Sequence, residues 1–219
     1  MSSFQAPRPG ILPAQSIETL IAVGAVTSDT PFDADQVQPA SLDLRLSDQA
    51  WRVRASFLPG RRKVEDRIAD VAMHAIEITD AGVVLEKGCV YIVRLQERLH
   101  LPKGLIARAN PKSSTGRVDV FVRLLTDQGA SFDDVAEGYD GPLYMEVAPQ
   151  TFSILVRPGT RLNQLRLKAG DPLCIVEAMK LFNQIKADKP LKVVKFLVEH
   201  GAVVWDYEIT VEPTERNLL

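Results

Sequence analysis

Apolar and polar residues alternate over short stretches along most of the chain. The pattern is clearest in residues 38–54, where Leu42, Leu44 and Leu46 are separated by the charged Asp43 and Arg45. Similar apolar runs cover residues 83–85, 89–95, 99–105, 118–123 and 143–148. A period of two predicts strands with alternate side chains on opposite faces. Many short strands without a long helix indicate an all-β barrel or jelly roll.

One short segment has helical spacing instead. Ile17, Leu20 and Ile21 are apolar at intervals of three and four residues, which predicts an amphipathic helix. Ser16 is the expected N-cap and Gly24 the expected end. By contrast, residues 54–70 contain the cationic turn Pro-Gly-Arg-Arg-Lys at 59–63, and we interpret this stretch as a solvated loop.

Composition and charge restrict the class of protein. The chain has 219 residues, 46% of them hydrophobic, with 26 Lys and Arg against 28 Asp and Glu. Without a basic excess, a nucleic-acid partner is not expected, and any anion site must be local. No segment has the length of a signal peptide's apolar region or of a membrane span, so we expect a cytoplasmic location and no membrane partner.

The Cys and His residues indicate no zinc site. Cys89 and Cys174 lie in apolar, strand-like surroundings, which favours buried thiols over a disulfide. The three histidines are scattered and form no His-x-Glu or Cys-x-x-Cys pattern. A deaminase site of the zinc type is therefore not predicted.

A loop with anion-binding chemistry lies between two apolar segments. Residues 110–117 read Asn-Pro-Lys-Ser-Ser-Thr-Gly-Arg, with two cations, three hydroxyls, a proline and a glycine. Hydroxyls, backbone N–H groups and cations together suit a phosphate group. The loop is not a Walker A sequence. Taken alone, it is also compatible with a solvated basic hairpin tip.

Four motifs in a fixed order carry a resemblance to a known family. They are Gln38–Leu46 (QPASLDLRL), Pro111–Arg117 (PKSSTGR), Gly138–Glu146 (GYDGPLYME) and Pro158–Leu165 (PGTRLNQL). Over about residues 10–167 the chain resembles the deoxycytidine triphosphate (dCTP) deaminase branch of the dUTPase-like superfamily. It is most similar to the N-terminal half of the long, duplicated bacterial members.

This resemblance implies a fold, a reaction and an assembly. The expected fold is a dUTPase-like distorted jelly-roll barrel with one short N-terminal helix. The expected reaction is hydrolytic deamination of dCTP to deoxyuridine triphosphate (dUTP) and ammonia, in a homotrimer whose nucleotide sites lie at subunit interfaces. Mg²⁺ is expected to arrive with the triphosphate, and the addition of water itself needs no metal.

The resemblance also implies catalytic residues. Glu146 lies between Met145 and Val147 in an apolar strand, at the position of the glutamate that activates water in the family. Ser113 and Arg117 match the residues that hold this water and stabilise charge. A carboxylate tuned by burial and an adjacent Arg can accept the proton of water and pass it to the leaving amine.

Three further residues match nucleotide-binding positions, and one matches a structural position. Lys112 and Ser114 correspond to phosphate-contacting residues, and Gln164 to a residue near the nucleotide. Asp43 matches a buried, hydrogen-bonded carboxylate at a subunit contact. The segment 135–138, Val-Ala-Glu-Gly, lacks the Asp that contacts the sugar in dUTPases, which argues against hydrolysis of dUTP. A deaminase that also hydrolyses the triphosphate stays open as a variant.

The C-terminal segment resembles a different family. Residues 169–188, which contain Glu177-Ala178-Met179-Lys180, are similar to the second half of the biotin carboxyl carrier domain, and the similarity extends to about residue 213. The resemblance implies biotin on Lys180, attached by a biotin ligase. The first half of that domain and the deaminase's basic closing arm are both missing.

The expected domains are therefore 1–168, a dCTP deaminase-like barrel, and 169–219, a partial biotinyl segment with three or four strands. Two alternatives to deaminase activity stay open. One is a biotin carboxyl carrier module of an acyl-CoA carboxylase. The other is a fusion of the two fragments that has neither activity.

Overall fold

The computed structural model describes residues 10–169, 174–178, 181–185, 191–196 and 209–213. The chain divides into two compact units, Met1–Ala169 and Gly170–Leu219.

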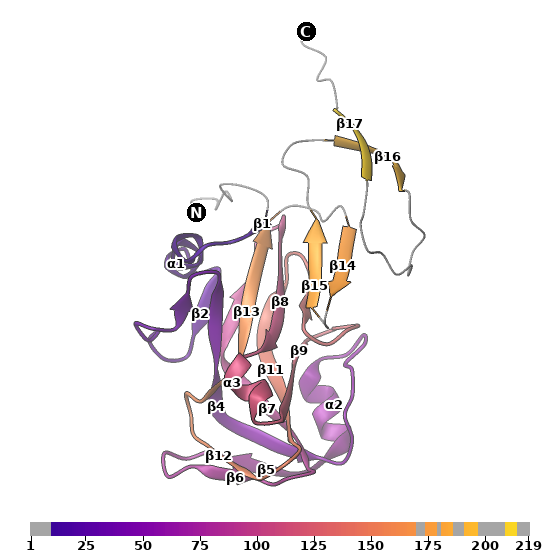
Figure 1. The fold of residues 1–219 in the computed structure, drawn as a ribbon. Coiled ribbons are helices and arrows are strands. Elements are labelled where there is room, and N and C mark those ends of the chain that lie inside the picture. Colours follow the sequence, from indigo (N-terminus) through magenta and orange to yellow (C-terminus); the bar gives the residue numbers. More distant parts are fainter. Residues whose placement is uncertain (1–9, 170–173, 179–180, 186–190, 197–208, 214–219) are drawn as a thin grey trace. The chain divides into compact units, whose positions relative to one another are not determined.

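The first unit consists mainly of strands, which confirms the all-β prediction (Figure 1). Its strands are β1 (Gly10–Ile11), β2 (Val26–Ser28), β3 (Val37–Gln38), β4 (Ser41–Val53), β5 (Ala72–Glu77), β6 (Val83–Leu85), β7 (Val90–His100), β8 (Leu105–Pro111), β9 (Val120–Thr126), β10 (Asp134–Val135), β11 (Asp140–Pro149), β12 (Ile154–Val156) and β13 (Arg161–Ala169). The predicted runs 83–85 and 143–148 lie within β6 and β11, and the runs 89–95 and 118–123 overlap β7 and β9. The run 99–105 instead spans the turn between the end of β7 and the start of β8.

One large antiparallel sheet organises the unit. Its main path runs β10-β8-β13-β4-β7-β11-β9, and β1, β2, β3 and β5 pair at its sides. Strands β6 and β12, which are distant in sequence, form a separate two-stranded antiparallel sheet. The sheet curls so that β8 and β9 approach each other, which nearly closes a barrel. Leucine and valine side chains from β4, β7, β9, β11 and β13 fill the interior.

The predicted N-terminal helix is present, but its predicted cap is wrong. Helix α1 (Ala14–Ala22) begins after Pro13, whose carbonyl accepts hydrogen bonds from the N–H groups of Ser16 and Ile17. Ser16 therefore lies inside the first turn. Gly24 follows the helix in the left-handed region, with φ of 78°, as expected for a glycine that ends a helix.

Two further helices correct the expectation of a single one. Helix α2 (Val64–Val71) occupies part of the stretch interpreted as a solvated loop. Val64 and Ile68, one turn apart, are buried against Ile92, Leu125 and Tyr144 in a second apolar cluster. In the turn before it, Pro59 is buried and residues 60–63 are exposed, so the prediction of exposure is confirmed for its cationic residues.

The third helix lies in the proposed phosphate loop. Helix α3 (Ser113–Arg117) is a single short turn that joins β8 to β9. These strands are not paired neighbours in the sheet, so the segment is not a hairpin tip.

Cys89 corrects another prediction. It is partly exposed rather than fully buried, and its Sγ lies 3.0 Å from Nη2 of Arg52. The side chain of Cys174 lies outside the described part of the structure.

The described residues of the second unit form four strands, the upper end of the predicted number. They are β14 (Cys174–Ala178), β15 (Leu181–Ile185), β16 (Leu191–Phe196) and β17 (Ile209–Pro213). β14 pairs with β15, and β16 with β17, both antiparallel. Among the described residues, no helix of either unit has the length and apolar character needed to cross a membrane.

Candidate active site

Glu146 lies on the outer face of the barrel wall. In β11 its cross-strand partners are Arg123 on β9 and Ile92 on β7. Because successive side chains of a strand point to opposite faces, the neighbours Met145 and Val147 enter the barrel core while Glu146 shares a face with Tyr144. Helix α2 packs on that face. The side chain of Glu146 is consequently buried, with 1% of its surface exposed.

The two carboxylate oxygens of Glu146 have different surroundings. Oε1 accepts hydrogen bonds from both Nε and Nη2 of Arg123, at 3.1 and 2.6 Å. Oε2 is buried and has no hydrogen-bond partner among the described residues. A buried oxygen without a partner is uncommon in folded proteins and requires a reason.

Arg123 is itself held in place by aromatic rings and a hydroxyl. Its guanidinium carbon lies 3.6 Å from the ring centre of Phe132 and 4.8 Å from that of Phe121. Nη2 also donates to Oγ of Ser56, at 2.7 Å. None of the four family motifs includes Arg123, which ends the alternating run 118–123.

In the loop 110–117, most of the side chains predicted to act on or bind the nucleotide are exposed. Ser113, Ser114 and Arg117 on α3 are exposed, whereas Lys112 immediately before the helix is partly buried. Lys112 Nζ forms an ion pair with Oδ2 of Asp43. Asp43 is 1% exposed, which confirms the prediction of a buried, hydrogen-bonded carboxylate.

Gln164 lies beside this ion pair. Strand β13 runs between β4 and β8, so Gln164 is paired with Asp43 on one side and Asn110 on the other. Its Oε1 accepts a hydrogen bond from Oγ of Ser41 at 3.0 Å. The structure thus brings Gln164 and Lys112 together around one buried carboxylate.

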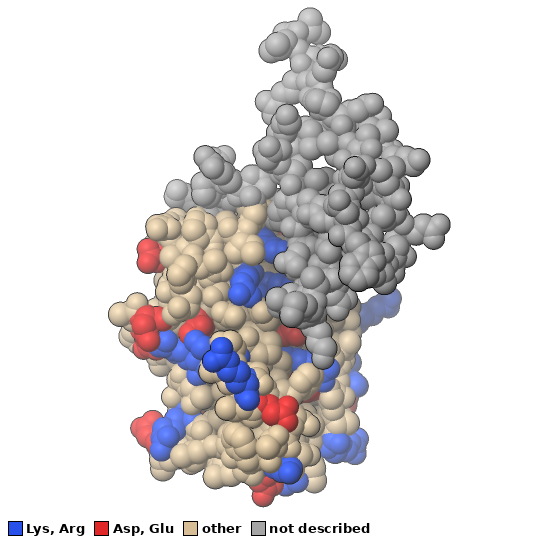
Figure 2. All heavy atoms as spheres, in the orientation of Figure 1, with Lys and Arg blue, Asp and Glu red and all other residues tan. Residues whose placement is uncertain are grey.

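Arg161 on β13 adds a positive charge close to Asp43 and pairs with two further carboxylates. Arg161 donates to Asp33 and Asp35, at 2.6 and 2.8 Å, and lies 3.9 Å from Asp43. The hydrogen bond to Asp35, followed by that to Asp33, raises the pKa of Arg161. On the face shown in Figure 2, basic and acidic side chains are interspersed over the first unit rather than gathered by sign.

A second carboxylate lies near Arg123. Asp133 accepts a hydrogen bond from the backbone N–H of Leu124 at 2.8 Å. Burial raises the pKa of Asp133 to about 6, against the smaller opposing effects of this hydrogen bond and of the positive charge on Arg123.

The predicted catalytic residues are not all joined within one chain. Among the described residues, no hydrogen bond or ion pair connects Glu146 to Ser113 or Arg117. Lys180 lies outside the described residues. No group of three or more His, Cys, Asp and Glu side chains in the described part is arranged to hold a metal ion.

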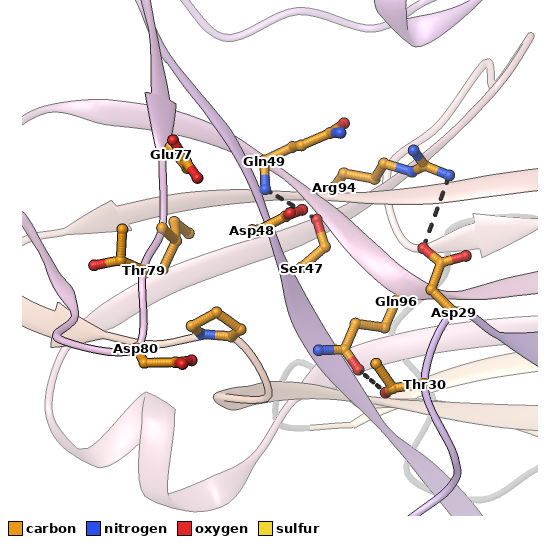
Figure 3. Close-up of a pocket in the computed structure, with 12 residues that line it drawn as sticks. Asp29, Thr30, Ser47, Asp48, Gln49, Glu77, Thr79, Asp80, Arg94 and Gln96 are labelled. Carbon is orange, nitrogen blue, oxygen red and sulfur yellow. Dashed lines mark hydrogen bonds and ion pairs between the residues drawn. The ribbon is translucent and has the colours of Figure 1, made fainter.

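A polar pocket of about 620 Å³ lies elsewhere in the first unit (Figure 3). Its walls include Asp48 and Gln49 from β4, Arg94 and Gln96 from β7, and Asp29. Arg94 Nη2 lies 3.9 Å from Oδ2 of Asp29. None of the predicted site residues lines this pocket.

Comparisons with known proteins bear on the whole first unit. Residues 8–171 match the family model of the 2′-deoxycytidine 5′-triphosphate deaminase N-terminal domain. The "dCTP deaminase, dUMP-forming" of Parafrankia sp. is 34% identical over 162 residues, covering 72% of this chain and 75% of its own. The dCTP deaminase of Halorubrum lacusprofundi is 28% identical over 158 residues, covering 71% and 75%.

A solved structure supports the same relationship. The crystal structure of 2′-deoxycytidine 5′-triphosphate deaminase from Agrobacterium tumefaciens matches with a TM-score of 0.73 and 50% identity. It covers 76% of this chain, whereas this chain spans only 50% of that one. This likeness confirms the predicted fold.

A second family model matches the C-terminal part. Residues 145–209 match the model described as "Biotin-requiring enzyme", which supports the resemblance seen in the C-terminal segment. The match begins within β11, so it also includes the last strands of the barrel.

Proposed function

Because this chain belongs to the 2′-deoxycytidine 5′-triphosphate deaminase N-terminal domain family, we propose that it deaminates dCTP hydrolytically, giving dUTP and ammonia. One structural observation supports the proposal most strongly. Glu146, at the family's motif position, is a buried carboxylate with one oxygen held by an arginine and the other without a partner. Such a group is suited to general base catalysis.

In the proposed deamination, Glu146, Ser113 and Arg117 have different roles. Oε2 of Glu146 accepts a proton from water as the water oxygen bonds to C4 of the cytosine ring. Glu146 then passes the proton to the amino group, and the C4–N bond breaks as ammonia leaves. Ser113 and Arg117 hold the water and stabilise charge that develops during the addition.

We infer that a complete site forms between subunits of a homotrimer. Two features support this assembly: Ser113 and Arg117 are exposed, and neither contacts Glu146 within one chain among the described residues. A neighbouring subunit would bring these groups to the carboxylate. Because Oε2 is closed to solvent in the single chain, the cytosine ring can reach it only after a surrounding side chain moves.

The triphosphate is proposed to bind on the other side of the loop. Lys112, Ser114 and Gln164 are the assigned ligands, and Lys112 would exchange its ion pair with Asp43 for the phosphates. Mg²⁺ would be held largely by phosphate oxygens and water, as is usual for this ion. A cytoplasmic location, where nucleotides are metabolised, remains a prediction.

The relatives differ in the nucleotide product that their names state. The Parafrankia protein is named dUMP-forming, whereas the Halorubrum protein is named dCTP deaminase without that addition. The segment 135–138 lacks an Asp at the sugar-contacting position. We therefore propose dUTP as the product; pyrophosphate among the products would contradict this.

The decisive experiment measures ammonia release from dCTP by the full chain and by Glu146→Gln. We expect release by the parent and near-complete loss in the variant. Equal rates would show that Glu146 is not the general base. Sedimentation of the parent protein tests the trimer, and a monomer with full activity would contradict an interfacial site.

A second candidate function is supported by the match of residues 145–209 to the biotin-requiring family. The protein would then act as a biotin carrier, with biotin attached to Lys180. The corresponding proposed domains are residues 1–168 and 169–219. Co-expression with a biotin ligase followed by a streptavidin blot tests the modification, with Lys180→Arg as control. A blot without signal removes the carrier function and leaves the deaminase proposal unaffected.

A further inference from the structure

We propose that Arg123 is a positioning residue for the reaction: it fixes the Glu146 carboxylate through one oxygen and leaves Oε2 as the oxygen that accepts the proton of water. This inference rests on the proposed role of Glu146. It adds a residue that neither the motifs nor the comparisons assign.

The geometry of the ion pair is the first argument. Nε and Nη2 of Arg123 both point to Oε1 of Glu146, at 3.1 and 2.6 Å. In a bidentate pair the two nitrogens would each engage a different oxygen. Here the second oxygen is left with its lone pairs unused, although it is buried.

This arrangement is unfavourable for a purely structural pair. Leaving one oxygen of a buried carboxylate without a donor is destabilising, and among the described carboxylates only Glu146 and Asp43 have such an oxygen. A general base has the opposite requirement, since the accepting oxygen must have no competing donor. The one-sided contact meets that requirement.

The contacts of Arg123 with Phe132 and Ser56 also indicate a positioning role. Its guanidinium carbon lies 3.6 Å from the ring centre of Phe132, and Oγ of Ser56 accepts from Nη2 at 2.7 Å. A planar guanidinium stacked on a ring has one preferred orientation, which a lysine ammonium does not reproduce. The stacking therefore fixes the direction from which Glu146 is held.

The cross-strand register is the third argument. Arg123 and Glu146 are directly opposed on β9 and β11, so the backbone ladder sets the distance between them. A site built on paired strands is more rigid than one built on loops. The orientation of the carboxylate is consequently set before substrate arrives.

The test compares Arg123→Gln and Arg123→Lys with the parent full chain in steady-state ammonia release from dCTP. Arg123→Gln should lower kcat about 10- to 100-fold, the effect of a misplaced catalytic group, while KM changes by less than about threefold. Arg123→Lys keeps the charge but not the two-nitrogen contact, so its kcat should lie between those of the parent and Arg123→Gln.

A matched control is available on helix α2. Arg67 also stacks on an aromatic ring, 5.8 Å from the centre of Phe57, and pairs with a carboxylate, that of Asp70 at 3.3 Å. That carboxylate is exposed. Arg67→Gln should retain the parent's kcat, which separates loss of positioning from general loss of an arginine.

A double variant distinguishes positioning from an independent role. If Arg123 acts through Glu146, then Arg123→Gln with Glu146→Gln should be no slower than Glu146→Gln alone. Multiplied losses would show that Arg123 acts on the substrate directly, and so would a raised KM with unchanged kcat.

The outcomes separate this inference from the proposed function. Full activity of Glu146→Gln would overturn both. An inactive Glu146→Gln with a normal Arg123→Gln would overturn only the role of Arg123. If Arg123→Gln does not fold, Arg123→Lys carries the test, and a kcat equal to that of the parent would overturn the positioning role.

Discussion

Two buried glutamates of the first unit pair with arginines, and they differ in how many of their carboxylate oxygens accept hydrogen bonds. In one, Oε1 of Glu97 accepts from Nε of Arg45 and from Gln36, at 2.9 and 2.7 Å, and Oε2 accepts from the backbone N–H of Arg45 at 2.8 Å. In the other, Arg123 engages only Oε1 of Glu146. Both glutamates are 1% exposed.

The difference shows what each pair is suited to do. The Glu97 carboxylate has a donor on each oxygen, so it fixes β4 against β7 and leaves no oxygen for chemistry. Burial nevertheless raises the pKa of Glu97, as expected for a charge removed from water. Glu146 has the same burial and the same kind of partner, but one oxygen remains without a donor. The two pairs therefore differ in whether the buried carboxylate has an oxygen free to accept a proton, not in burial.

The largest expected effect concerns Glu146→Gln. Its kcat for dCTP should fall about 100- to 10,000-fold, because the general base is lost. Its stability should change little, since an amide oxygen can still accept from Arg123. Thermal unfolding and ammonia release on the same sample measure both quantities. A fall in melting temperature as large as that of a broken buried pair would make Glu146 a structural residue like Glu97.

The reciprocal prediction concerns Glu97→Gln. Both oxygens of Glu97 accept hydrogen bonds, so the amide NH2 of the Glu97→Gln variant must face a donor, which is not the case at Glu146. Arg45, at 3% exposure, also loses its counter-charge, so the free energy of unfolding should fall by about 3–5 kcal/mol. The folded fraction should keep the parent's kcat. Urea unfolding measures the loss, with Glu86→Gln as control. The pair of Glu86 with Arg52 is partly exposed, so this variant should lose less than about 1 kcal/mol.

A smaller, pH-dependent effect is expected beside Arg123. The pKa of Asp133 is raised from 3.8 to about 6, so the neutral carboxyl stabilises the folded state. That contribution is complete below pH 3.8 and is lost as the pH rises through about 6. Above pH 6 the native protein therefore contains an unfavourable buried charge.

Asp133→Asn should remove this charge and keep the hydrogen bond from Leu124. Its left-handed backbone, with φ of 65°, is compatible with Asn. The gain at pH 7.5 should be about 1–2 kcal/mol once partial exposure is allowed for, and close to zero at pH 4. Melting curves across this range measure it. A gain independent of pH, or one shared by the exposed neighbour in Asp134→Asn, would contradict the assignment.

The smallest expected effect is on α3, where neighbouring serines have different assigned roles. Ser114→Ala should raise KM for dCTP about fivefold, the equivalent of one hydrogen bond to phosphate, with kcat unchanged. Ser113→Ala should instead lower kcat. Both residues are exposed, so neither change should alter the melting temperature. The same kinetic effect from both substitutions would remove the distinction between the two roles.

Local sequence patterns predicted much of the barrel. Alternation in residues 38–54 identified β4, and the spacing of Ile17, Leu20 and Ile21 identified α1. These features depend on neighbours along the chain, and a period of two or of 3.6 is visible without knowledge of the fold.

Helix α2 was missed for a physical reason. Its apolar residues are few, chiefly Val64 and Ile68, and the cationic turn before them is typical of a solvated loop. The first helical turn contains Glu65 and Asp66, a signal that favours a helix start. The helix is stabilised largely by packing on Tyr144 and Leu125, which lie far away in sequence.

By itself, the sequence determined the strand pattern, the first helix, the family motifs and the place of a carboxylate in an apolar strand. The tertiary structure decided which arginine meets that carboxylate, which of its oxygens is engaged, and that Lys112 pairs with Asp43. Cross-strand register and the packing of α2 determine these contacts. Both join residues distant in the chain, so no local pattern of apolar and polar positions contains them.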